Sequence, residues 1–273
     1  MSNDFCYINS GINPSPKRKL SCPPVSQDNI MSAFMSSRCN FDQDCPSPDQ
    51  KCCEAKCTAG EPLPMEPRVI ELISGNMKQV EGGFFFVGAI GLAQSNGINV
   101  LYDTGNIADK IPLLKALREK AGLYPQDIDF LVTSHGHPDH FSNINLFPDV
   151  PNTFNAFNIK HWDYMYNGLN DDGNGILIQN DPNLEVIQTP GHTLQDTSLV
   201  VRNVANMGTV LLVGDTFYFE NDHMMPAFFE GPTKDQFLSS RARIACMADW
   251  IIPGHGPMFQ VNEDIKNFFN CTA

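Results

Sequence analysis

Positive charge and long apolar runs are both scarce in this chain of 273 residues. It carries 18 Lys and Arg against 31 Asp and Glu, which leaves a formal net charge of −13. Such a balance exerts no general attraction on a phosphate backbone. The longest apolar run, Phe84 to Ala93, is interrupted by Gly88 and Gly91 and falls short of the roughly 18 residues that cross a bilayer. The composition therefore predicts a soluble globular protein with no membrane partner.

Cysteine is nearly absent beyond residue 57. Seven of the nine cysteines lie within the first 57 residues, and only Cys246 and Cys271 follow. The same N-terminal segment is rich in proline and has no apolar periodicity, so cysteine chemistry is the main source of a fixed fold there. From about residue 68 the sequence pattern changes to apolar segments typical of strands and helices. We therefore expect a cysteine-rich segment over residues 1–65 and a separate globular domain over residues 66–273.

The segment from Cys39 to Cys57 resembles the middle of a whey-acidic-protein (four-disulfide-core) module. The adjacent cysteine pair, the Asp before Cys45 and the Pro after it match that family, although two cysteines of the family pattern are missing. The connectivity stays open for the disulfide candidates Cys22, Cys39, Cys45, Cys52, Cys53 and Cys57. A disordered leader and a zinc site are the alternatives for this segment.

Strand-like and helix-like segments alternate after residue 68, with hairpins among them, which predicts an α/β layered fold. The turn Asn96-Gly97 predicts a hairpin between residues 83–93 and 98–102. A helix over residues 110–121 is expected to end at Gly122 and to bury Ile111, Leu114, Leu117 and Ala121. Further strands are expected at 69–73, 128–133, 154–159, 184–189, 197–201, 210–213 and 250–252, and a helix around 244–248.

The strongest chemical signal is a run of four metal-competent side chains, His135, His137, Asp139 and His140, directly after the expected strand 128–133. Residues two apart share one face of an extended chain, so His135 and His137 turn to the same side. Three imidazoles and a carboxylate packed together would be costly without a cation. With zinc they form a usual donor set.

Three more metal-competent side chains follow expected strands in the same way: His192, Asp215 and His255, each directly after a glycine. Strand ends that deliver ligands into one crevice are typical of sites in α/β sheets. A serine nucleophile motif of the Gly-x-Ser-x-Gly type does not occur. The pattern predicts metal-assisted hydrolysis.

Together with Asp103-Thr104-Gly105, these motifs resemble the metallo-β-lactamase superfamily over residues 66–268, which implies its αββα sandwich fold. The resemblance implies one zinc ion held by His135, His137 and His192. It implies a second held by Asp139, His140 and His255, with Asp215 bridging the two. It also implies that Asp103 is a structural residue that orients a ligand histidine, with a strand-end turn as the alternative. Two such ions would lower the pKa of a bridging water, and Asp139 would orient the resulting hydroxide or take its proton.

Within the superfamily, residues 143–148 and 248–257 are most similar to the metallo-β-lactamase domain-containing protein 1 subfamily. That similarity implies an endoribonuclease that acts on the 3′ ends of histone pre-mRNA, as a homodimer in cytosol and nucleus. The first residues show no secretory leader, which agrees with those compartments. An extracellular location is the alternative if the cysteine-rich segment is oxidised and the true N-terminus differs.

The acidic charge of the domain argues against RNA as the substrate, although Lys160, Arg202, Lys234, Arg241 and Arg243 are candidates to line a groove. A small-molecule ester or thioester hydrolase of the glyoxalase II type is the alternative. A secreted binding or antiprotease protein of the whey-acidic-protein type is an alternative of another class.

Three aromatic side chains, Trp162, Tyr164 and Tyr166, follow the expected strand 154–159. We interpret them as packing residues, with a position over the mouth of the site as the alternative.

Overall fold

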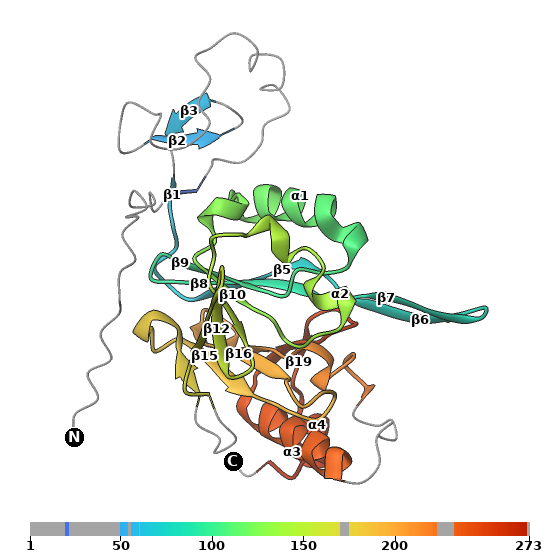
Figure 1. Ribbon diagram of the computed structural model, residues 1–273. Helices are drawn as coiled ribbons and strands as arrows, with labels where there is room; N and C mark the ends of the chain where they lie inside the picture. The colour runs from blue at the N-terminus through green and yellow to red at the C-terminus, as the bar shows by residue number, and fades with distance from the viewer. Residues whose placement is uncertain are drawn as a thin grey trace. The chain divides into compact units, whose positions relative to one another are not determined.

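The computed structural model describes the backbone of residues 20–21, 50–53, 56–59, 61–169, 175–222 and 232–271 (Figure 1). Side chains are described within residues 63–169, 175–222 and 233–271. The chain divides into two compact units, Met1–Pro62 and Leu63–Ala273. Each unit is described by itself.

In the N-terminal unit, two short pairs of antiparallel strands are described. β1 (Leu20–Ser21) pairs with β4 (Glu61–Pro62), and β2 (Gln50–Cys53) pairs with β3 (Lys56–Ala59). The register of the second pair places Cys52 opposite Cys57. The other disulfide candidates, Cys22, Cys39 and Cys45, lie outside the described residues, so the disulfide framework stays a prediction.

Two mixed sheets form the second unit. The first sheet has the strand order β13-β12-β11-β10-β9-β8-β5 and the second has the order β14-β15-β16-β17-β18-β19. The strands of the first sheet are β5 (Arg68–Ile73), β8 (Ile90–Ser95), β9 (Ile98–Tyr102), β10 (Phe130–Val132), β11 (Asn152–Phe154), β12 (Phe157–Lys160) and β13 (Asp163–Tyr166). Those of the second are β14 (Ile176–Leu177), β15 (Leu184–Gln188), β16 (Thr197–Val204), β17 (Gly208–Leu212), β18 (Trp250–Ile252) and β19 (Phe259–Gln260).

Successive residues of the central strands point to opposite faces of each sheet, and both faces are buried. In β8, Ala93 belongs to the apolar core shared by the two sheets, whereas its neighbour Leu92 packs in the core that includes α1 (Lys110–Ala121). In β17, Leu212 and Leu211 divide in the same way between the shared core and the core that includes α3 (Pro232–Met247) and α4 (Glu263–Phe268). Figure 1 shows α1 on one side of the sheets and α3 and α4 on the other, the layering of an αββα sandwich.

Helix α1 has the predicted length but buries a different face. It ends at Gly122, which adopts the left-handed conformation at φ 66° that favours glycine. Leu113, Ala116 and Leu117 are its buried residues, whereas Ile111 is 67% exposed. The predicted buried face was therefore wrong: it is rotated about the helix axis from the observed one. Apolar residues on both sides of the observed face made the two hard to distinguish.

Two predicted strands are interrupted in the structure. Residues 83–93 divide into β7 (Gly83–Val87), which pairs with β6 (Asn76–Val80), and β8. The interruption lies at Gly88, where an added Cβ would come within 2.2 Å of the Asp139 carbonyl oxygen. Residues 154–159 contain the end of β11, a turn at Asn155 (φ 51°) and the start of β12. Both corrections arise from turns that the apolar pattern does not reveal.

A disulfide joins Cys246 at the end of α3 to Cys271, beyond α4. The sequence analysis did not pair these two cysteines. No helix among the described residues is long and apolar enough to cross a membrane.

Candidate metal centre

The seven predicted ligands lie on loops that follow four strands. β10 leads into the loop of His135 and His137 and then into the single-turn helix α2 (Pro138–Phe141), which carries Asp139 and His140. The loops after β15, β17 and β18 carry the remaining three side chains, His192, Asp215 and His255. Glycines in these loops allow the candidate ligands to approach one another, because a side chain there would collide with a ligand. At Gly254, an added Cβ would lie 2.0 Å from a carboxylate oxygen of Asp215.

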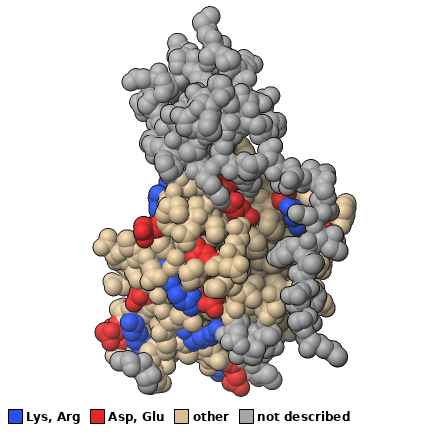
Figure 2. Space-filling model, turned by 90° about the vertical axis from the view of Figure 1, so that its left-hand side faces the viewer, with Lys and Arg blue, Asp and Glu red and all other residues tan. Residues whose placement is uncertain are grey.

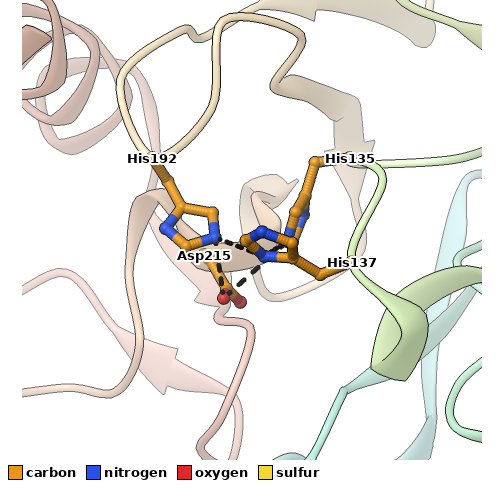
Figure 3. Close-up of side chains that lie close together, drawn as sticks. All are labelled: His135, His137, His192 and Asp215. Carbon is orange, nitrogen blue, oxygen red and sulfur yellow. Dashed lines mark hydrogen bonds and ion pairs between the residues drawn. The ribbon is translucent and has the colours of Figure 1, made fainter.

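The first group of ligands contains His135, His137, His192 and Asp215, whose ligand atoms all lie within 4.8 Å of one another. His137 Nδ1 is 2.9 Å from both His135 Nε2 and His192 Nε2. Asp215 Oδ2 is 3.3 Å from His192 Nε2. Figure 3 shows the three imidazoles and the carboxylate turned toward one point from three separate segments.

The second group of ligands contains Asp139, His140 and His255. Asp139 Oδ2 is 3.7 Å from His140 Nε2 and 3.6 Å from His255 Nε2. The other carboxylate oxygen of Asp215, Oδ1, is 3.1 Å from His140 Nε2 and 3.2 Å from His255 Nε2. The carboxylate of Asp215 therefore lies between the two groups, and each of its oxygens faces one of them.

Two buried atoms at the junction of the groups lack a hydrogen-bond partner among the described residues. They are His140 Nε2 and Asp215 Oδ1. An unsatisfied buried polar atom costs free energy, and buried polar groups in native proteins are nearly always paired. A divalent cation that accepts a lone pair from each atom would remove this cost. Both atoms face the second group, so they fit a metal ion there, and the first group offers the same imidazole and carboxylate donors.

Four of the five imidazoles have their second ring nitrogen fixed by a neighbour. His140 Nδ1 donates to Asp103 Oδ2 at 2.8 Å, and His255 Nδ1 donates to the Val87 carbonyl at 3.0 Å. His135 Nδ1 lies 3.0 Å from the Ser134 hydroxyl, and His192 Nδ1 lies 3.0 Å from the Tyr218 hydroxyl. Such bonds fix the tautomer and turn the Nε2 lone pair into the centre.

Asp103 supports both groups at once. It holds His140 directly, and it also accepts hydrogen bonds of 2.7 Å from the Ser134 backbone N–H and the Ser134 hydroxyl. Because Ser134 in turn contacts His135, one buried carboxylate orients a histidine of each group. Through these hydrogen bonds Asp103 can orient His140 directly and His135 through Ser134, and its role as an orienting residue stays a prediction.

Burial and neighbouring charges shift the pKa values of the histidines of the centre in opposite directions. Burial lowers the pKa of His135 to about 2 and that of His192 to about 4, so both imidazoles are neutral at pH 7 and have free lone pairs. Burial also opposes charge on His140, but the carboxylates of Asp215 and Asp103 outweigh it and raise its pKa. Burial likewise raises the pKa of Asp215, yet His140 and His255 together lower it well below its usual value. A carboxylate that stays ionised suits a ligand shared by two cations.

The centre is open on one side. His135, His140 and His255 are buried, whereas His137 is exposed and the Asp139 side chain is 18% exposed. Substrate therefore has access from the side of His137 and Asp139.

Three of the five predicted groove cations are engaged elsewhere. Arg241 is buried against Asp222 and lies over the ring of Phe217, Arg202 pairs with Glu185, and Arg243 donates to the Gln188 carbonyl. Lys160 and Lys234 are exposed. Figure 2 shows basic and acidic side chains interspersed over the described part of one face. Arg241 is therefore no longer a candidate to line a groove, because its side chain is buried against Asp222.

The hydrogen-bond partners of the candidate ligands were not predicted from the sequence. Ser134 and Tyr218 belong to no metal-binding motif, and the contribution of Val87 is a backbone carbonyl. Ser134 stands directly before His135 and could have been noticed for that reason. For Tyr218, which contacts a histidine 26 positions away, no sequence signal exists.

The comparisons with known proteins agree with this geometry. Residues 83–255 match the metallo-beta-lactamase superfamily. Metallo-beta-lactamase domain-containing protein 1 of Xenopus laevis is 35% identical over 207 residues, which cover 73% of this chain and 84% of that protein. Its human counterpart is 38% identical over 165 residues, 59% of each chain. An uncharacterized Caenorhabditis elegans protein is 31% identical over 189 residues, 67% of this chain, and the match spans about half of that relative's length (51%).

Among solved structures, a metallo-beta-lactamase-type protein of Thermotoga maritima superimposes with a TM-score of 0.53 at 17% identity. The match covers 71% of this chain and 99% of that protein, and at this identity it supports the fold alone. The chain belongs to the metallo-beta-lactamase superfamily of metal-dependent hydrolases and, within it, to the family of metallo-beta-lactamase domain-containing protein 1.

Proposed function

We propose that this protein is a zinc-dependent endoribonuclease with two metal ions in its active site. The observation that carries the proposal is the position of Asp215, which offers one carboxylate oxygen to each of two histidine groups. Two-metal sites are common in enzymes that hydrolyse phosphodiesters. Imidazole and carboxylate donors without thiolates suit zinc in a catalytic site.

His135, His137 and His192 would hold one ion, and Asp139, His140 and His255 the other, with Asp215 shared. When bound, such ions lower the pKa of a water molecule and polarise the scissile group. Asp103 and Ser134 keep His140 and His135 in the required orientation before substrate arrives. Asp139 is the partly exposed carboxylate of the second group. We assign it the role of general base, which takes a proton from the attacking water.

RNA as substrate rests on the family resemblance, which implies cleavage of histone pre-mRNA 3′ ends. The activity, substrate and homodimeric state of the whole relatives are therefore proposals for this chain. The acidic composition limits the number of phosphate contacts and favours recognition close to the scissile bond over tracking along the backbone.

The compartment is a proposal as well. We propose cytosol and nucleus, where the RNA substrate is found. The disulfide between Cys246 and Cys271 is more typical of an oxidising compartment. Alkylation of free thiols in freshly lysed cells, followed by mass spectrometry, tests this point. Alkylated Cys246 and Cys271 support cytosol and nucleus, and a bridged pair with protected N-terminal cysteines supports the extracellular alternative.

The direct test is cleavage of end-labelled single-stranded RNA by the zinc-loaded protein. We expect internal cleavage that disappears after chelation and in Asp139→Ala. The exposed carboxylate of Asp235 on α3 provides a matched control, and Asp235→Asn is expected to cleave normally. Intact RNA together with rapid hydrolysis of a thioester or simple ester by the same preparation would reject the nuclease proposal and favour the small-molecule alternative.

A further inference from the structure

The end of the first sheet presents several rings on one face. Cross-strand partners point to the same side of a sheet, and the register pairs Phe154 with Phe157, Phe157 with Tyr166, and Ile159 with Tyr164. The ring centroid of Phe157 is 4.9 Å from that of Tyr166 and 6.2 Å from that of Tyr164. We call the four rings of Phe154, Phe157, Tyr164 and Tyr166 the aromatic face.

The aromatic face is open to solvent. Tyr164 is 63% exposed and Tyr166 is 82% exposed, and Trp162 in the adjoining turn is 94% exposed. The interpretation of these residues as packing was therefore wrong, because β13 is an edge strand of the described sheet and no layer of described residues covers its side chains. Contiguous exposed rings on a soluble domain mark binding surfaces more often than chance.

A pocket of about 450 Å³ lies between this face and the loop that carries His135 and His137. Phe154, Ile159 and Tyr164 of the sheet line it, and so do Thr133 and Gly136. Gly136 lies between the ligands His135 and His137. A molecule in the pocket would therefore extend from the exposed rings to the open side of the centre. The volume is within the range of small-ligand sites.

One amide side chain stands among the residues that line this pocket. Asn152 is 6% exposed, and its Oδ1 accepts a hydrogen bond of 3.0 Å from the Thr133 hydroxyl. The Nδ2 group of the same amide is a hydrogen-bond donor. The pocket thus suits a flat ring that carries an acceptor on its edge.

Among the described residues, no Lys or Arg lines the pocket, and His161 of its lining contacts Asp149 at 2.9 Å. The site is therefore matched to an uncharged ring and not to a phosphate. Single-stranded nucleic acids offer such rings, since every base has a face that stacks on aromatic side chains.

We propose that the aromatic face and its pocket form a subsite that stacks unpaired nucleobases of single-stranded RNA next to the metal centre, an inference that rests on the proposed function. The pocket takes one base with its acceptor edge toward Asn152 Nδ2, and the exposed rings of Tyr164 and Tyr166 take its neighbours. Recognition through rings explains how an acidic domain can hold RNA with few phosphate contacts.

Binding is tested separately from cleavage with a fluorescein-labelled oligouridylate of about twelve nucleotides, a length that covers the sites of typical single-strand binders. Fluorescence anisotropy is measured with the full chain, both zinc-loaded and chelator-treated. We expect Tyr164→Ala and Tyr166→Ala each to weaken binding about tenfold. Tyr164→Phe should retain binding because the ring remains.

The matched control is Met165→Ala, since Met165 is 64% exposed on the opposite face of the same strand. It should bind as the parent does, and a duplex of the same length should bind weakly. The affinity should fall only slightly with salt, with a log–log slope shallower than about −1.5, the value for roughly two neutralised phosphates.

Equal effects of Met165→Ala and Tyr164→Ala, preference for the duplex, or a steep salt slope would overturn the inference. So would a dimer that dissociates in Tyr166→Ala without change in RNA binding, because the aromatic face would then contact a second copy. The two proposals fail in different ways. RNA that binds through the rings but is never cleaved refutes the nuclease alone, whereas cleavage with unchanged KM in Tyr164→Ala refutes the subsite alone.

Discussion

The metal centre and the aromatic face are built on opposite principles. The side chains of the centre are mostly buried, carry charge and lone pairs, and have their orientations fixed by hydrogen bonds to neighbours. Those of the aromatic face are uncharged, and its two tyrosines, Tyr164 and Tyr166, are exposed. The two regions meet at Thr133 and Gly136. The difference teaches that the proposed chemistry depends on buried, preorganised groups, whereas the proposed recognition depends on exposed ring surface that a ligand would cover.

The largest effect is expected at the residue common to both ligand groups. Asp215→Asn keeps the size of the side chain but removes the charge that faces two cations, so kcat/KM should fall at least about a thousandfold. Steady-state cleavage of labelled RNA measures this effect, with Asp235→Asn as the control. Activity within a few-fold of the parent would show that the centre does not depend on a shared carboxylate.

A smaller loss is expected when the support of the ligands is removed. Asp103→Asn weakens the hydrogen bond that orients His140 and, through Ser134, the one that orients His135. The affinity for zinc should therefore fall about 10- to 100-fold. Ser134→Ala affects His135 alone and should lose less. Competition with a chromophoric chelator measures both affinities. Equal affinities in the parent and Asp103→Asn would show that orientation contributes little here.

The aromatic face should behave differently in the same assay. Tyr164→Ala should raise KM for RNA about tenfold and leave kcat nearly unchanged, because stacking contributes to binding and not to the chemical step. Asp103→Asn should instead lower kcat at saturating RNA. A fall in kcat for Tyr164→Ala would mean that the two regions are not separable.

These residues also show what a sequence can predict. The two groups of candidate ligands could be predicted because their residue types and spacing belong to one chemistry and follow the ends of strands. The α/β layering followed from the alternation of strand-like and helix-like apolar segments, and the αββα arrangement followed from the family resemblance.

What could not be predicted depends on contacts between distant segments. The break at Gly88 is set by the approach of Asp139, and the face of α1 is set by the sheet beneath it. The aromatic face was missed because the turn at Asn155 is hidden within an apolar run, and without it the register of Phe157 and Tyr166 is unknown.

The smallest effect on activity is expected at the C-terminal disulfide, which lies in neither region. Replacing Cys246 and Cys271 together by Ser should lower the free energy of unfolding by roughly 3 kcal/mol, the loop-closure contribution of a bridge over 25 residues. Thermal and urea denaturation measure the loss, and RNA cleavage below the transition should be unchanged. Loss of RNA cleavage in a double variant that is still folded would show that the activity of the metal centre depends on the disulfide.

The central claim is that the two ligand groups hold two metal ions through one shared carboxylate. Elemental analysis of the purified parent, Asp215→Asn and Asp235→Asn after zinc loading and desalting tests it most directly. The account predicts two zinc ions per chain in the parent and in Asp235→Asn, and fewer than one in Asp215→Asn. A parent that retains a single ion, or an Asp215→Asn protein that retains both, would contradict it.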